Sequence, residues 1–74
     1  MARVLHLFKG DHATEAAAVI AAQVAAGDRV TVALLAGAVV PRLPTGVEVH
    51  RVPEDASYER LLELIFAADS VVTW

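Results

Sequence analysis

Two short apolar runs without polar alternation constrain this chain more than any other feature. Residues 4–8 and 29–35 are rich in Val and Leu and carry few polar side chains. A strand with this pattern is one that is covered on both faces. Residues 13–26, which lie between the two runs, are dominated by alanine, the strongest helix former, and Gly27 follows as a helix stop. This succession predicts two parallel strands joined by a crossover helix.

The second half of the chain predicts three further elements. Residues 47–52 alternate between apolar and polar, which predicts a strand with one wet face at the edge of a sheet. Ser57 can cap a helix that runs to about Ala67, and residues 71–74 form a last short strand. Residues 38–43 are too short and too proline-interrupted to predict a helix.

These elements predict one α/β domain over residues 1–74. We expect a small three-layer fold with a parallel sheet of about four strands in the order 3-2-1-4. This order buries the two doubly apolar strands and leaves the alternating strand at an edge. Right-handed crossovers then put the two helices on opposite faces of the sheet.

The composition is unusually apolar for so short a chain. The 74 residues are 57% hydrophobic and 20% charged, whereas a small domain has a high ratio of surface to volume and so needs more polar residues. We therefore expect apolar surface on the outside of the monomer and a partner or a second copy that covers it. Phe66 and Trp74 are the candidate interface residues, because aromatic side chains are enriched at interface centres; for Trp74 a place in the core is an equal alternative.

Charge and hydropathy exclude several classes of partner. The chain has six basic and nine acidic residues and no basic cluster, so the sequence does not predict direct nucleic-acid binding. The longest apolar runs are about half of the roughly 20 residues that a membrane-spanning helix needs, so we expect no membrane segment. Charged residues such as Lys9 and Glu15 interrupt the region where a signal peptide would be apolar. The chain is therefore expected to be cytoplasmic.

The carboxyl ends of the strands are where a parallel sheet binds its ligands. After the first strand they present Lys9, Gly10, Asp11 and His12, and this rim faces the amino end of a helix, which attracts anions. The chain has no glycine-rich phosphate motif. His12 is the one histidine expected to be accessible for proton transfer, and even there a plain loop residue is the better interpretation.

The remaining polar residues predict structural roles. We expect His6 to be packed inside its strand with one backbone hydrogen bond, and His50 to be solvated on the wet face of the edge strand. The acidic residues around the second helix are explained by the helix dipole rather than by a metal ion. The sequence thus predicts no catalytic residue, no metal site and no cofactor. The acidic residues are Glu54, Asp55, Glu59 and Glu63.

The C-terminal segment, residues 58–74, resembles the end of DsrH/TusB-type proteins, with an aromatic-led helix, a valine-rich strand and a terminal Thr-Trp. Residues 5–9, 27–30 and 47–55 are also similar to that family. Two departures mark an abbreviated member: residues 35–37 keep only the glycine of the family pattern, and residues 53–57 cross directly where the family has an additional segment.

The resemblance implies a subunit of a sulfur-relay complex beside Cys-bearing DsrE- and DsrF-like, or TusD- and TusC-like, subunits. In such assemblies persulfide sulfur moves toward 2-thiolation of a tRNA wobble uridine or through sulfur oxidation. This chain has no cysteine, so it cannot hold a persulfide. The implied role is a non-catalytic structural or docking subunit. The alternative is a free-standing homo-oligomeric module that binds a small anion at the rim from Lys9 to His12.

Overall fold

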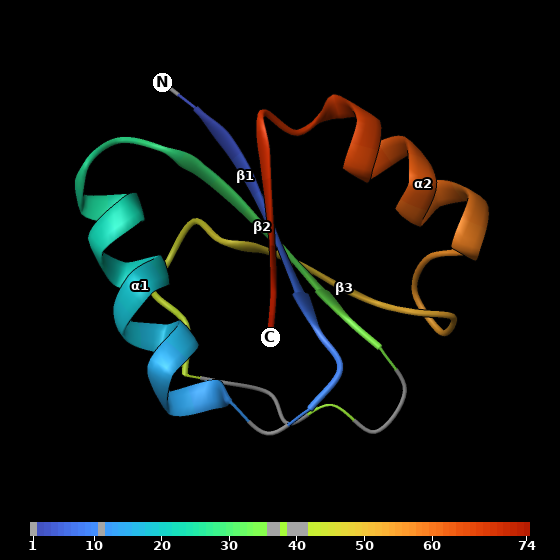
Figure 1. The fold of residues 1–74 in the computed structure, drawn as a ribbon, viewed down its shortest axis with the longest axis horizontal. Helices are drawn as coiled ribbons and strands as arrows, with labels where there is room; N and C mark the ends of the chain where they lie inside the picture. The colour runs from blue at the N-terminus through green and yellow to red at the C-terminus, as the bar shows by residue number, and fades with distance from the viewer. Residues whose placement is uncertain (1, 11, 36–37, 39–41) are drawn as a thin grey trace.

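The protein folds into four strands and two helices (Figure 1). A computed structural model describes residues 2–10, 12–35, 38 and 42–74. The elements lie within one or two residues of the predicted bounds. Residues 39–41, within the segment 38–43 for which no helix was predicted, lie outside the described residues. The elements are β1 (Arg3–Phe8), α1 (Ala13–Ala25), β2 (Arg29–Leu34), β3 (Glu48–Arg51), α2 (Tyr58–Ala67) and β4 (Ser70–Thr73).

The four strands form one parallel sheet in the order β3-β2-β1-β4. This confirms the α/β fold and the predicted 3-2-1-4 order. β1 and β2 are central because their apolar residues need cover on both faces, and β3 and β4 form the two edges. Figure 1 shows α1 and α2 on opposite sides of the sheet.

The α1 face of the sheet holds one part of the core. Ala16 and Ile20 of α1 pack against the side chains of β1 and β2 that point to this face. The helix ends in a Schellman arrangement: Gly27 N–H donates to Val24 O, and Asp28 N–H donates to Gln23 O, each at 3.0 Å. Gly27 has a φ of 90°, which confirms the predicted glycine stop. The sheet residues in this core are Phe8, Val30, Val32 and Leu34.

The α2 face holds the second part of the core. Leu61 of α2 packs on Leu5 and Ala33, and Val52 and Ala56 of the preceding loop complete the cluster. The helix begins where predicted, because the Ser57 hydroxyl oxygen accepts a hydrogen bond from Arg60 N–H at 3.1 Å.

β3 differs from its predicted pattern of exposure. It lies at an edge as expected, but Val49 is 39% exposed, while His50 is only half-exposed and its Nε2 atom is buried without a hydrogen-bond partner among the described residues. The expectation of a solvated His50 is therefore wrong. The register gives the physical reason: His50 pairs with Ala33 and so shares the α2 face of the core, whereas Val49 pairs with Val32 and lies on the α1 face at the open edge.

No helix in the described ranges has both the length and the apolar character needed to cross a membrane.

Candidate functional site

A buried chain of side-chain hydrogen bonds runs through His6. His6 is fully buried in β1. Trp74 Nε1–H donates to His6 Nδ1 at 2.9 Å, and His6 Nε2 lies 2.7 Å from Gln23 Oε1. Since Nδ1 accepts from the indole, Nε2 carries the imidazole proton and donates it to Gln23. The two ring planes are inclined by only 14°, with the centroids 6.1 Å apart.

This arrangement changes the interpretation of His6 and Trp74. His6 is buried as predicted, but its partners are two side chains rather than the backbone. Trp74 is half-buried, packs on the α1-face core, and lies near Phe8 with ring centroids 6.4 Å apart. The contacts of Trp74 within the chain therefore give it a packing role, whether or not a partner also touches it.

The rim predicted to bind an anion is only partly described. Lys9 and His12 are exposed, Gly10 is half-buried, and Asp11 lies outside the described residues. Lys9 N–H donates to Trp74 O at 3.2 Å, so this backbone group already has a partner. His12 occupies the N-cap position of α1, and its side chain makes no capping hydrogen bond.

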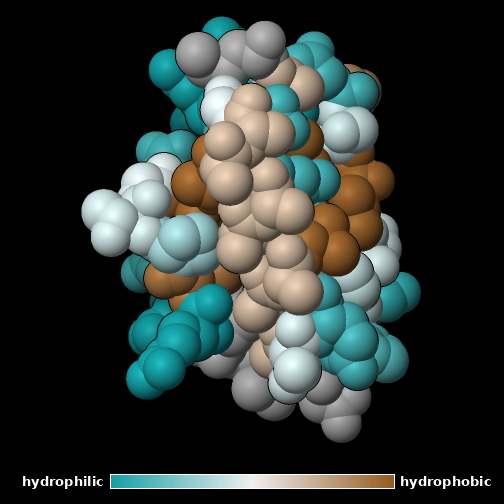
Figure 2. All heavy atoms as spheres, turned by 90° about the vertical axis from the view of Figure 1, so that its left-hand side faces the viewer, coloured by the Kyte–Doolittle hydropathy of each residue, from teal (hydrophilic) through white to brown (hydrophobic). Residues whose placement is uncertain are grey.

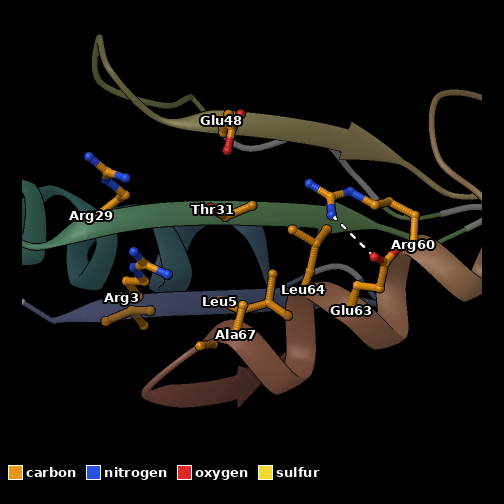
Figure 3. A pocket seen from close by; sticks show the side chains of 11 residues that line it. Arg3, Leu5, Arg29, Thr31, Glu48, Arg60, Glu63, Leu64 and Ala67 are labelled. Carbon is orange, nitrogen blue, oxygen red and sulfur yellow. Dashed lines mark ion pairs between the residues drawn. The ribbon is translucent and has the colours of Figure 1, made fainter.

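A groove of about 240 Å³ opens instead at the amino ends of the strands, on the α2 face (Figure 3). Its floor is apolar and comes from Leu5 in β1 with Leu64 and Ala67 in α2. Arg3 and Arg29 stand at one end of the groove, and the hydroxyl of Thr31 lies along its length. The remaining polar side chains on the wall are Glu48, Arg60 and Glu63.

The sheet register brings the two arginines together. Arg3 in β1 is directly paired with Arg29 in β2, and side chains paired in a parallel ladder point to the same face. Among the described residues neither guanidinium group lies within ion-pair distance of a carboxylate. Arg60, by contrast, is 3.9 Å from Glu63 Oε2. The sequence analysis did not predict that Arg3 and Arg29 lie together. The one sequence signal for it is that each arginine is the first residue of an apolar strand.

A second surface feature is an apolar stripe along α2. Tyr58, Leu62 and Phe66 follow one another at intervals of four residues and are 62%, 54% and 85% exposed. Helical geometry puts this stripe on the flank away from Arg60 and Glu63, which border the groove. The groove side of α2 faces β2 and β3, so the stripe lies toward the opposite edge strand, β4, where Val71 is 40% exposed.

The outer surface of α1 is also weakly polar. Figure 2, which looks onto the side of the molecule where α1 lies, shows a pale-brown band between teal and darker brown residues. The helix contains Glu15 as its single charged residue, and Val19 is 38% exposed. The predicted apolar surplus is thus found on the surface of both helices.

Two of the four acidic residues near α2, Asp55 and Glu63, have partners in the structure. Asp55 Oδ2 accepts from Arg51 N–H at 3.2 Å, and Glu63 pairs with Arg60. Within the described ranges, no three His, Asp or Glu side chains gather closely enough to hold a metal ion.

Comparison with protein-family models, with curated proteins and with solved structures finds no match. The described residues form a small parallel α/β module with a groove that carries Arg3 and Arg29 and an exposed apolar stripe on α2.

Proposed function

We propose that this chain is a non-catalytic docking subunit of a sulfur-relay complex. The observation that carries the proposal is the exposed stripe of Tyr58, Leu62 and Phe66 on α2. A Phe side chain that is 85% exposed loses the hydrophobic stabilisation that burial would give, and such residues in a row mark an interaction surface. A partner that covers the stripe would bury it.

The open edge of the sheet at β4 also supports a docking surface at the α2 stripe. β4 pairs with β1 on one side only, so its other side offers unpaired backbone groups next to the stripe. A partner with its own edge strand can extend the sheet there while an apolar face packs on α2. We propose a Cys-bearing DsrE/DsrF-like or TusD/TusC-like α/β subunit as this partner, which rests on the resemblance of residues 58–74 to DsrH/TusB-type proteins.

The absence of cysteine is the reason for proposing a non-catalytic role. Persulfide transfer needs a thiolate, and the chain has no cysteine. Within a relay it would hold and orient the sulfur-carrying subunits, in the cytoplasm, in a process such as 2-thiolation of a tRNA wobble uridine or sulfur oxidation. No cofactor is required for this role.

Co-purification tests the proposal. The tagged chain is expressed together with a Cys-bearing DsrE-like subunit, and the recovered partner is identified by mass spectrometry. We expect stoichiometric recovery with the wild type, a loss of at least about tenfold with Phe66→Ser, and no change with Val19→Ser, which alters an exposed apolar residue on the other helix. Circular dichroism checks that both variants are folded.

Two outcomes would overturn the proposal. One is a wild-type chain that stays a clean monomer and recovers no such subunit. The other is self-association through the stripe, seen by light scattering and abolished by Phe66→Ser, because the occupant would then be a second copy. The second outcome would favour the homo-oligomeric alternative. The main support for the anion site predicted there, from Lys9 to His12, is the exposed side chain of Lys9.

A further inference from the structure

We propose that the groove at the amino ends of the strands binds a small ligand through an oxyanion group, phosphate or carboxylate, held between Arg3 and Arg29. The binding site is distinct from the α2 stripe and from the rim at Lys9, which lies at the other end of β1.

The spacing of the two arginines is the first argument. They are register partners on neighbouring strands, which are about 4.8 Å apart in a sheet. Two guanidinium groups carried by neighbouring strands on one face of a sheet repel each other, and an anion bound between them would relieve this repulsion. Guanidinium groups also bind phosphate and carboxylate oxygens in pairs of parallel hydrogen bonds, which gives both strength and orientation.

The second argument is that two neighbouring carboxylates, those of Asp28 and Asp69, accept hydrogen bonds from the backbone. Asp69 Oδ2 accepts from the backbone N–H of Arg3 at 2.8 Å, and Asp28 Oδ1 accepts from Ala2 N–H at 3.3 Å. Both acids are therefore fixed in loop contacts, and the Arg3 and Arg29 guanidinium groups keep their donors available among the described residues.

The rest of the groove defines the ligand. The volume of about 240 Å³ is below the usual range of roughly 300 to 1,000 Å³ for drug-sized ligands, so the molecule is small. Leu5 and Leu64 supply an apolar floor, and Glu48 on the wall supplies a hydrogen-bond acceptor (Figure 3). A compact phosphorylated or carboxylated compound with a hydroxyl or amino group at its other end fits this pattern.

A purely structural role for Arg3 predicts a different result. Ala67 and Ala68 at the C-terminal end of α2 line the same groove, and this helix has no basic residue in its last turn. A nearby cation stabilises the negative end of a helix dipole. If this were the whole role of Arg3, its replacement would lower stability equally with and without an anion.

The experiment measures thermal unfolding of the full chain in inorganic phosphate, in acetate, and in sodium chloride at matched ionic strength. Amide chemical shifts of Arg3, Arg29 and Thr31 are followed in parallel by NMR. We expect one of the two oxyanions to raise the midpoint above the chloride value and to shift these amides; which one does so distinguishes phosphate from carboxylate recognition.

Variants decide where the anion binds. Arg3→Gln and Arg29→Gln should each weaken the anion's apparent affinity by about tenfold, in keeping with the loss of a charge-assisted hydrogen bond. Arg51→Gln is the matched control, because Arg51 is exposed and pairs with Leu34, whose side chain points to the α1 face. Three results would overturn the proposal. The first is an unfolding midpoint that rises as much in chloride as in the oxyanions, and the second is an unchanged anion response in both Arg3→Gln and Arg29→Gln. The third is loss of the anion response in Lys9→Gln.

Discussion

Trp74 Nε1–H donates a hydrogen bond of 2.9 Å to His6 Nδ1, so residue 74 is joined to the buried centre of β1. The backbone of Trp74 adds two further links, since its N–H donates to Leu7 O at 2.8 Å and its carbonyl accepts from Lys9 N–H at 3.2 Å. These contacts fix the end of β4, which pairs with β1 at the edge of the sheet.

Replacing the indole should destabilise the fold more than the loss of ring area implies. Trp74→Phe removes the donor and leaves His6 Nδ1 buried without a partner, which costs about 1 to 3 kcal/mol of unfolding free energy. Urea unfolding followed by circular dichroism measures the change. Tyr58→Phe, on a side chain that is 62% exposed, is the control and should stay within about 0.5 kcal/mol of the wild type. Equal effects of the two variants would contradict the assigned hydrogen bond.

The other side of His6 gives a second prediction. Gln23→Leu keeps a similar volume but removes the acceptor of the His6 Nε2 proton, so we expect a loss of about 1 to 3 kcal/mol in unfolding free energy. Gln23→Glu keeps an acceptor at the same reach and should retain most of the stability at neutral pH. Combining Gln23→Leu with Trp74→Phe should give a non-additive loss, because both partners act on one imidazole. Strict additivity in this cycle would argue that the two hydrogen bonds are independent.

Gly27 should tolerate replacement by alanine poorly. Its φ of 90° lies in the left-handed region, and it closes the Schellman arrangement of α1. Gly27→Ala should therefore lower the unfolding free energy by about 1 kcal/mol through backbone strain alone, since no atom lies within 4 Å of the added methyl group. Gly10→Ala is the control, because its new Cβ would meet only His12 Cδ2 at 3.9 Å, an ordinary contact. A Gly27→Ala protein as stable as Gly10→Ala would refute this.

The hydroxyl oxygen of Ser57 should stabilise the start of α2. Ser57→Ala removes the acceptor of Arg60 N–H at the start of α2 and should lower stability by about 1 kcal/mol, whereas Ser57→Asp should preserve the cap and complement the helix dipole. Thermal unfolding of the three proteins in one buffer measures the order. If Asp were no better than Ala, the cap would not contribute as the structure indicates.

The elements and their order can be predicted from local sequence patterns. Continuous apolar runs at residues 4–8 and 29–35 require cover on both sides, and this requirement alone places β1 and β2 in the centre. Gly27 and Ser57 specify helix ends through local backbone chemistry, which a sequence displays directly. These features are local, so they can be predicted without knowing the register between strands.

Contacts between distant side chains depend on the assembled fold. His6 lies 68 residues from Trp74, and Arg3 lies opposite Arg29, because the ladder aligns strands at one register rather than another. A shift of one residue would turn each of these side chains to the other face of the sheet. Register depends on the summed packing of both layers, so the hydrogen-bonded His6 and the arginine-lined groove follow from the assembled sheet and not from any local pattern.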